Sequence, residues 1–276
     1  MIIWLASYPK SGNTWVRLFL DNLFSSANKF NINNNIVGQF PLRKHFKDLN
    51  IDVNNLDDFA MNCNAAQLKI NLDKKIKIFK THNAMWNWKN GKKFFTNETN
   101  TLGVIYIVRD PRNIITSVLN YFHKKSYKNA LEFMRENKVL GGGEEDHGLP
   151  TIIASWSNHY NSWKKFKKNY LLVKYEDLLK EPNKEFLKIT NYLNQIGNFK
   201  FDNDKILKAV ENCNFNNLSK QEDALGFAGN SKTNKKLKQK FFNLGPKNKW
   251  ENILEPGIKN EIEFSFKEEM IKLGYL

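Results

Sequence analysis

The chain has 276 residues, and we expect them to form a single domain spanning residues 1–276. Its 43 basic against 28 acidic residues give a formal net charge of +15, so acidic partners are expected: nucleic acid, an anionic membrane surface or a phosphorylated small molecule. Two distant cysteines exclude a disulfide framework and a cysteine metal cluster. No run reaches the roughly 18 apolar residues of a membrane span, so we expect a cytoplasmic protein without a membrane partner.

The chain begins with a pattern of strand, tight loop and helix. An apolar run at residues 2–6 precedes the sequence Tyr-Pro-Lys-Ser-Gly-Asn-Thr-Trp at residues 8–15, and an apolar-periodic run follows at residues 16–24. The loop offers Lys10, hydroxyl groups and main-chain amides at a helix N-terminus. Unpaired N–H groups and the helix dipole favour an anion there, so the pattern predicts an oxyanion-binding loop.

Polar, weakly periodic residues follow at 25–75, where we expect an irregular or partly helical excursion that forms a substrate wall. A short apolar run at residues 76–79 predicts a second strand, which ends at Lys80-Thr81-His82. Residues 83–100 are loop-like. This part of the chain is therefore expected to carry polar side chains to one strand end.

The strongest strand pattern lies at residues 102–108, a continuous β-branched run typical of a buried parallel strand. It ends at Arg109. Asp110 is expected to cap the next helix, with Pro111 in its first turn. Arg112 is either a second phosphate contact or a surface residue at that helix start, and we expect the surface position.

The second half of the chain continues the alternation of helices and strands. A glycine-rich acidic stretch at residues 141–146 is a lid candidate, and residues 151–168 read as an amphipathic helix in which His159 packs or caps locally. A fourth strand is expected at residues 171–175, followed by a helix through Leu187. Further helices are expected at 203–212 and 257–273.

Strands that alternate with helices predict an α/β domain with a central, mainly parallel sheet flanked by helices. Ligands of such sheets bind at the carboxyl ends of the strands. Polar side chains follow each of the four expected strands, so we expect them to converge on one site; they are Lys10, Ser11, His82, Arg109, Asp110, Tyr175 and Glu176.

Two alternative functions stay open at this point. A kinase-type phosphate loop needs a leading glycine that is missing before Lys10, and Arg109 beside Asp110 suits a second anion better than a metal. A nucleotide with two anionic groups and no required metal fits better, with a P-loop-like kinase as the alternative. A nucleic-acid-binding protein is the non-enzyme alternative. The lysine runs at 164–168 and 235–240 lack the signature of a nucleic-acid-binding module, so no nucleic-acid partner is expected.

Five segments resemble, in order, motifs of the PAPS-dependent sulfotransferases, with PAPS standing for 3′-phosphoadenosine 5′-phosphosulfate. Residues 8–15 look like the 5′-phosphosulfate loop, and 108–117 resemble the 3′-phosphate segment. The others, 80–82, 173–178 and 241–250, resemble the catalytic-histidine motif, the Tyr-Glu-Asp segment and the C-terminal cofactor loop. The resemblance covers residue 2 to about 255. It implies the P-loop-NTPase-like sulfotransferase fold and transfer of a sulfuryl group to a hydroxyl or amine of a small-molecule acceptor, with PAP as product.

The resemblance also implies roles for single residues. The catalytic set is His82 as base, Lys10 at the bridging oxygen, and Ser117, which with Arg109 grips the 3′-phosphate. Trp15 and Phe215 would sandwich the adenine, and Tyr175 would bind its polar edge. The implied cofactor-binding set is Lys10, Ser11, Gly12, Asn13, Thr14, Trp15, Arg109, Ser117, Tyr175, Phe215 and Gly245.

The chain departs from the family pattern in the C-terminal loop. Asn243-Leu244 stands where the family usually carries an Arg-Lys pair before Gly245, and Lys247 is a candidate to compensate. Cys213-Asn214 replaces a Thr-Ser pair before Phe215, so one hydroxyl contact is missing. The acceptor cannot be read from the sequence, although the acidic residues 144–146 hint at a cationic or polar one. The oligomeric state stays open, with a homodimer among the possibilities.

Overall fold

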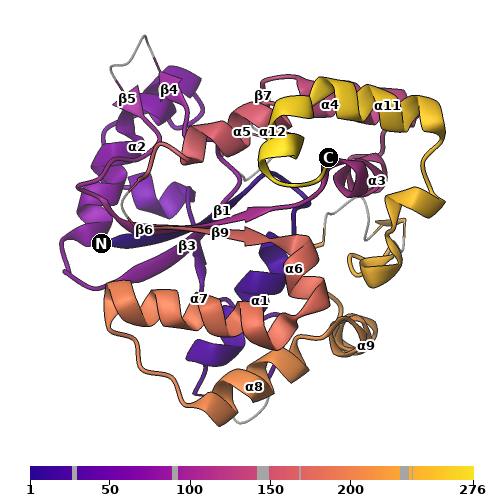
Figure 1. Ribbon diagram of the computed structural model, residues 1–276. Coiled ribbons are helices and arrows are strands. Elements are labelled where there is room, and N and C mark those ends of the chain that lie inside the picture. The colour runs from indigo at the N-terminus through magenta and orange to yellow at the C-terminus, as the bar shows by residue number, and fades with distance from the viewer. Residues whose placement is uncertain (27–29, 89–92, 142–148, 168, 231–235, 238) are drawn as a thin grey trace.

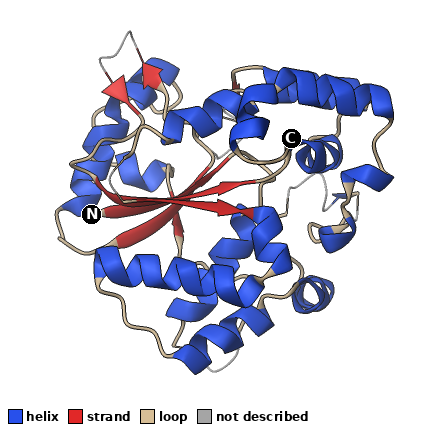
Figure 2. Ribbon diagram, in the orientation of Figure 1, coloured by secondary structure: helices blue, strands red, loops and turns tan. Residues whose placement is uncertain are grey.

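A five-stranded, fully parallel sheet forms the centre of the molecule (Figures 1 and 2). The computed structural model describes residues 1–276 except 27–29, 89–92, 142–148, 168, 231–235 and 238. The strand order is β2-β3-β1-β6-β9. This confirms the expected α/β class. The strands are β1 (Ile2–Ser7), β2 (Gly38–Gln39), β3 (Lys77–Thr81), β6 (Thr101–Val108) and β9 (Tyr170–Lys174).

Helices cover both faces of this sheet, and alternate side chains of the strands meet them. On β1, Trp4 faces a cluster that includes Trp163, whereas Leu5 faces the opposite cluster with Phe19 and Phe186. Figure 1 shows α1, α7 and α8 on one face and α2, α5 and α12 on the other. The helices are α1 (Asn13–Phe24), α2 (Leu56–Asn71), α3 (Pro111–Tyr121), α4 (Tyr127–Arg135), α5 (Trp156–Trp163), α6 (Tyr175–Lys180), α7 (Pro182–Gly197), α8 (Asn203–Asn212), α9 (Phe215–Leu225), α11 (Pro256–Ser265) and α12 (Lys267–Lys272).

The strand register brings the carboxyl ends together. Leu5 of β1 pairs with Lys80 of β3 on one side and with Ile105 of β6 on the other. Val108 at the end of β6 pairs with Lys174 at the end of β9. The residues that follow these strands therefore share one edge of the sheet.

Several local expectations differ from the structure. The loop-like stretch 83–100 contains a short antiparallel pair, β4 (Asn87–Trp88) and β5 (Lys93–Phe94). The stretch 151–168 is not one helix. It starts as β8 (Thr151–Ile153), paired with β7 (Lys138–Leu140), and the Ser155 side chain caps α5 only afterwards.

Two other elements are shorter than expected. The helix expected over 257–273 divides at Phe266 into α11 and α12. Tyr175 opens α6 instead of ending β9. The lid candidate at 141–146 lies, except for Gly141, outside the described residues. Short 3-10 helices complete the fold at η1 (Arg43–Phe46), η2 (Gly245–Lys247) and η3 (Trp250–Asn252).

Candidate functional site

A cleft of about 1130 Å³ opens at the carboxyl edge of the sheet. Of the site residues expected from the sequence, Ser11, Asp110 and Glu176 are absent from the lining, and the others line the cleft. They come from the ends of β1, β3, β6 and β9 and from the C-terminal loop, which are far apart in the sequence. The lining members of the expected set are Lys10, Gly12, Asn13, Thr14, Trp15, His82, Arg109, Ser117, Tyr175, Phe215 and Gly245.

The loop between β1 and α1 presents main-chain amides to this cleft. Gly12 is the N-cap of α1 with φ of 105°, and since it has no side chain the first amides of the helix stay available to a ligand. A Cβ at Gly12 would overlap the Tyr175 ring. Ser11 Oγ and Trp15 Nε1 are buried and have no hydrogen-bond partner among the described residues. The loop therefore offers unpaired donors beside a helix N-terminus.

Lys10 carries the cation of this loop. Its Nζ lies 3.9 Å from the centre of the Tyr121 ring and 4.4 Å from that of Phe241. Burial, with a smaller contribution from Arg109, lowers the Lys10 pKa to about 7. An anion beside Nζ would restore the full charge, because an opposite charge favours the ammonium form.

Arg109 provides a second cation at the end of β6. Its guanidinium lies 4.1 Å from the centre of the Tyr175 ring, and Nη1 donates to the Lys10 carbonyl at 3.3 Å. The Arg109 Nε is buried and has no partner among the described residues. The arrangement leaves part of the guanidinium able to bind a second anionic group.

His82 follows β3 and is held in one tautomer. Its Nδ1 lies 3.0 Å from the Ser7 carbonyl oxygen, which can only accept, so Nδ1 carries the proton and Nε2 keeps a lone pair. Burial, with smaller contributions from Lys80 and Lys10, lowers the His82 pKa to about 4, although the Ser7 hydrogen bond opposes this. The imidazole is therefore neutral near pH 7 and can accept a proton.

His159 holds the main chain at His82. Its Nε2 lies 3.1 Å from the His82 carbonyl oxygen and its Nδ1 lies 2.8 Å from Tyr106 Oη. The carbonyl requires a proton on Nε2, so Nδ1 accepts from the tyrosine. The expectation of a local packing or capping role for His159 is wrong, because both contacts are with distant residues.

Lys80 is a cleft residue that was not among the site residues expected from the sequence. Lys80 lines the cleft two residues before His82, and burial, with a contribution from Arg17, lowers its pKa to about 8. Side chains two residues apart on a strand share a face, so the position of Lys80 relative to His82 was a usable signal.

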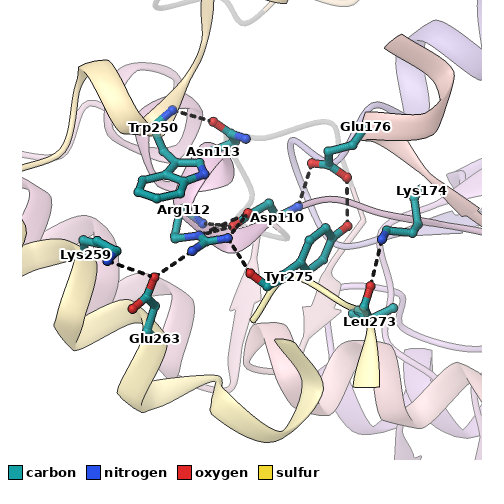
Figure 3. Close-up of polar contacts among 10 residues, drawn as sticks. All are labelled: Asp110, Arg112, Asn113, Lys174, Glu176, Trp250, Lys259, Glu263, Leu273 and Tyr275. Atoms are coloured by element: carbon teal, nitrogen blue, oxygen red, sulfur yellow. Dashed lines mark hydrogen bonds and ion pairs between the residues drawn. The ribbon is translucent and has the colours of Figure 1, made fainter. Parts of the chain in front are cut away.

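Arg112 is a buried residue, and its expected surface position is wrong (Figure 3). Its Nη2 lies 2.7 Å from Asp110 Oδ2, and its Nη1 lies 2.6 Å from Glu263 Oε1. Asp110 also caps α3, as expected, by accepting from the Arg112 amide at 2.8 Å. The start of α3 is therefore tied to the C-terminal helices.

The C-terminal loop approaches the cleft at Gly245, whose φ is 50°. A Cβ at this position would overlap the Phe215 ring. Asn243 and Leu244, which replace the family's cations, both line the cleft. Lys247, the replacement cation suggested by the sequence, is exposed and lies outside the cleft lining. Lys240 lines the cleft instead.

Two general features of the described residues complete the picture. Within them, no helix combines the length and apolar character needed to cross a membrane. The same part of the chain contains no group of three or more His, Cys, Asp or Glu residues arranged to hold a metal ion.

A parallel sheet whose strand ends surround a cationic cleft, with an open helix N-terminus inside it, defines an α/β protein whose cleft suits an anionic ligand. The family model for the sulfotransferase domain matches residues 2–274, so the chain belongs to the sulfotransferase family. The resemblance found in the sequence and the enzyme class it implied are thereby confirmed.

Relatives match most of the chain at low identity. Cytosolic sulfotransferase 1 of Arabidopsis thaliana is 25% identical over 288 residues, which cover 96% of this chain and 77% of the relative. Flavonol 4′-sulfotransferase of Flaveria chlorifolia is 22% identical, and the match covers 99% of this chain and 80% of the relative.

Solved structures share the fold. Mouse sulfotransferase SULT7A1 complexed with PAP superimposes with a TM-score of 0.60 at 18% identity, covering 98% of this chain and 84% of that one. Retinol dehydratase in complex with androsterone and inactive cofactor PAP superimposes with a TM-score of 0.60 at 17% identity, covering 98% of this chain and 80% of that one.

Proposed function

We propose that this protein transfers the sulfuryl group of PAPS to a hydroxyl or amine of a small-molecule acceptor. One observation carries the proposal: a single cleft combines the open N-terminus of α1, the neutral His82 with Nε2 free to accept, and the cations Lys10 and Arg109. A base, an anion-binding loop and a second anion site are the parts that such a transfer needs.

The buried, unpartnered polar atoms of the site fit an anionic nucleotide. Ser11 Oγ, Trp15 Nε1 and Arg109 Nε all can donate, and none has a hydrogen-bond partner among the described residues. Buried donors normally have partners, so a ligand rich in acceptor oxygens suits this set. PAPS, when bound, would supply the sulfuryl group for transfer, and its 5′-phosphosulfate and 3′-phosphate would be the two anionic groups. The residues proposed to hold it are Lys10, Ser11, Gly12, Asn13, Thr14, Trp15, Arg109, Ser117, Tyr175, Phe215 and Gly245.

The proposed reaction is an in-line displacement. His82 Nε2 takes the proton of the acceptor hydroxyl or amine while the acceptor atom forms its bond to sulfur and the sulfur bond to the bridging oxygen breaks. The Lys10 ammonium stabilises the negative charge that grows on that oxygen, and the amides of the loop hold the sulfonate oxygens. Lys80, which lies in the same cleft, adds positive charge beside His82.

The nucleotide-holding roles complete the proposal. Arg109 and Ser117 bind the 3′-phosphate, Trp15 and Phe215 enclose the adenine, and Tyr175 contacts its polar edge. No metal is needed for this proposed role.

We further propose one domain over residues 1–276 and a cytoplasmic location, since relatives carry the name cytosolic sulfotransferase.

A thermal-shift comparison tests the nucleotide. Adenosine 3′,5′-bisphosphate (PAP) should stabilise the protein by about 2.7 kcal/mol at a hundred times its Kd, because a ligand that binds only the folded state adds RT ln(1 + [L]/Kd). Stabilisation by ATP with Mg²⁺ alone would favour the P-loop-like kinase instead. Screening acceptors with labelled PAPS then tests the transfer itself.

A further inference from the structure

We propose that the C-terminal segment, residues 263–276, positions the second anion site of the cleft, with Arg112 and Glu176 as the positioning residues through which it acts. The inference rests on the proposed function, because the ligand of that anion site is the 3′-phosphate. The segment lies outside the cleft lining, so its effect must pass through the residues that contact it.

Arg112 forms the first connection (Figure 3). Its guanidinium binds both carboxylate oxygens of Asp110, with Nε to Oδ1 at 3.0 Å and Nη2 to Oδ2 at 2.7 Å. The same group donates to the Tyr275 carbonyl at 2.8 Å and lies 4.1 Å from the centre of the Trp250 ring. With the Glu263 ion pair, these contacts fix Asp110 to the C-terminal segment. A planar, bidentate guanidinium holds a carboxylate in one orientation.

Glu176 forms the second connection. One carboxylate oxygen, Oε1, accepts from the Asp110 amide at 3.0 Å, and the other, Oε2, accepts from the Tyr275 hydroxyl at 2.8 Å. Figure 3 shows the Tyr275 ring between Arg112 and Glu176. The C-terminal segment therefore contacts Glu176, which follows Tyr175, directly, and it is connected to Asp110, which follows Arg109, through Arg112 and Glu176.

Arg109 and Tyr175 are the pair that these connections hold. The Arg109 guanidinium lies 4.1 Å from the centre of the Tyr175 ring, and both residues line the cleft. Fixing the residue after each of them fixes the direction in which each side chain leaves the main chain. The positions of the two side chains therefore depend on the contacts that Glu263 and Tyr275 of this segment make with Arg112 and Glu176.

The same turn of α3 also holds the C-terminal loop. Asn113 Oδ1 accepts from the Trp250 amide at 2.9 Å, and the Asn113 carbonyl accepts from Asn248 Nδ2 at 2.8 Å. This loop lacks the usual Arg-Lys pair, and Lys240, the lining residue that directly precedes the loop, is paired with Asp223 at 2.6 Å. Arg109 is thus left with a larger share of the second anion site, so its position matters more.

Two variants test the inference through a ratio of affinities. Tyr275→Phe keeps the ring and its packing but removes the hydroxyl from Glu176, and Arg112→Lys keeps the charge but not the bidentate contact. Isothermal titration calorimetry measures the Kd for PAP and for adenosine 5′-monophosphate, which differ only in the 3′-phosphate. We expect each variant to bind PAP about tenfold more weakly, with the monophosphate affinity within about twofold of wild type.

Arg135→Ala is the matched control, because it removes the contacts of Arg135 with Ser265 and Glu261 at the exposed side of α11 and leaves the start of α3 untouched. The ratio of its Kd for PAP to its Kd for adenosine 5′-monophosphate should equal that of wild type. An unchanged ratio in Tyr275→Phe, or equal weakening of both nucleotides, would overturn the inference even if Arg112→Lys fails to fold. A wild-type protein that does not distinguish the two nucleotides would overturn the proposed function as well.

Discussion

At the scale of single residues, two titratable groups in the cleft are shifted in ways that suit opposite tasks. Burial keeps His82 neutral by lowering its pKa to about 4, and burial lowers the Lys10 pKa to about 7. A neutral imidazole can accept a proton, whereas a lysine that is only about half protonated in the free cleft near pH 7 gains its full charge when an anion enters. The two groups therefore define the pH range of activity.

The first prediction concerns this pH range. In the free enzyme kcat/KM should be lost below about pH 4, where His82 is protonated, and above about pH 7, where Lys10 loses its proton. Lys10→Arg should remove the alkaline loss, since a guanidinium stays charged, even if the maximal rate is lower. The measurement is the pH profile of kcat/KM for both proteins. If Lys10→Arg still loses kcat/KM above about pH 7, the alkaline loss comes from a group other than Lys10.

The second prediction concerns the base. His82→Ala should lower kcat by about 10²–10⁴-fold, because a positioned general base contributes about that much. The PAP affinity should stay within about twofold, since the proposed role of His82 is toward the acceptor. His123→Ala is the control, because His123 lies outside the cleft lining. A His82→Ala enzyme with wild-type turnover would remove the proposed role.

At the scale of elements, α1 fixes one wall of the cleft through a buried ion pair. Arg17 Nη1 lies 2.6 Å from Asp21 Oδ2, and both side chains are almost fully buried. Asp21 Oδ1 accepts from the Val37 amide at 2.6 Å, and Arg17 donates to the Asn34 carbonyl at 3.1 Å. The pair therefore holds the segment that leads to β2, whose Gln39 lines the cleft.

The third prediction follows from this ion pair. Asp21→Ala should reduce the free energy of unfolding by about 3–5 kcal/mol, because it leaves the Arg17 charge buried without its partner. The double variant Arg17→Met with Asp21→Leu should recover much of the loss. Lys184→Ala, which breaks an exposed pair with Glu181, should leave the free energy of unfolding nearly unchanged, because solvent screens an exposed ion pair. Urea unfolding measures all three, and equal losses for Asp21→Ala and Lys184→Ala would contradict the argument.

The fourth prediction concerns the contact between the C-terminal loop and α9. Gly245→Ala should weaken PAP binding about tenfold, because its Cβ would displace the Phe215 ring and its φ of 50° suits glycine. Gly257→Ala on α11 is the control, since a Cβ there meets nothing within 4 Å. Calorimetric titration of both variants checks this. Equal affinities would show that the ring adapts without cost.

At the scale of the whole molecule, three buried or partly buried histidines link stability to pH. Burial lowers the pKa of His45 and of His82 to about 4 and that of His159 to about 3. The unfolded chain therefore binds protons below about pH 6.5 that the folded protein does not bind. Their contribution to stability is present above about pH 6.5 and is lost as the pH falls toward 4.

The fifth prediction is that the free energy of unfolding is lower at pH 5 than at pH 7, with His82 and His159 each contributing up to about 2 kcal/mol and the partly exposed His45 less, because solvent screens its charge. Asp21 and Glu176, whose carboxyl pKa values burial raises, oppose this just above pH 4. Urea unfolding at the two pH values measures the difference. His159→Phe should reduce it relative to wild type, and an identical difference in the variant would contradict the role given to His159.

Sequence patterns alone were enough for four of the five strands of the central sheet, the loop at residues 8–15 and the family. Continuous β-branched runs such as 102–108 identify buried parallel strands because their side chains face helices on both sides. The loop motif is local, since its chemistry depends on adjacent residues. Short pairings such as β7 with β8 were missed, because a three-residue strand forms only through its distant partner.

Only the tertiary structure decided which polar residues act together, because burial and hydrogen bonding depend on neighbours that are remote in the sequence. Arg112 looked like a surface residue at a helix start, yet Glu263 and Tyr275, more than 150 positions away, bury and bind it. His159 looked local, yet it holds the His82 carbonyl. The sequence alone determined the loop at residues 8–15, the parallel sheet and the sulfotransferase family, whereas the fold decided the tautomer of His82, the burial that shifts the pKa values of His82 and Lys10, and the connection between the start of α3 and the C-terminus.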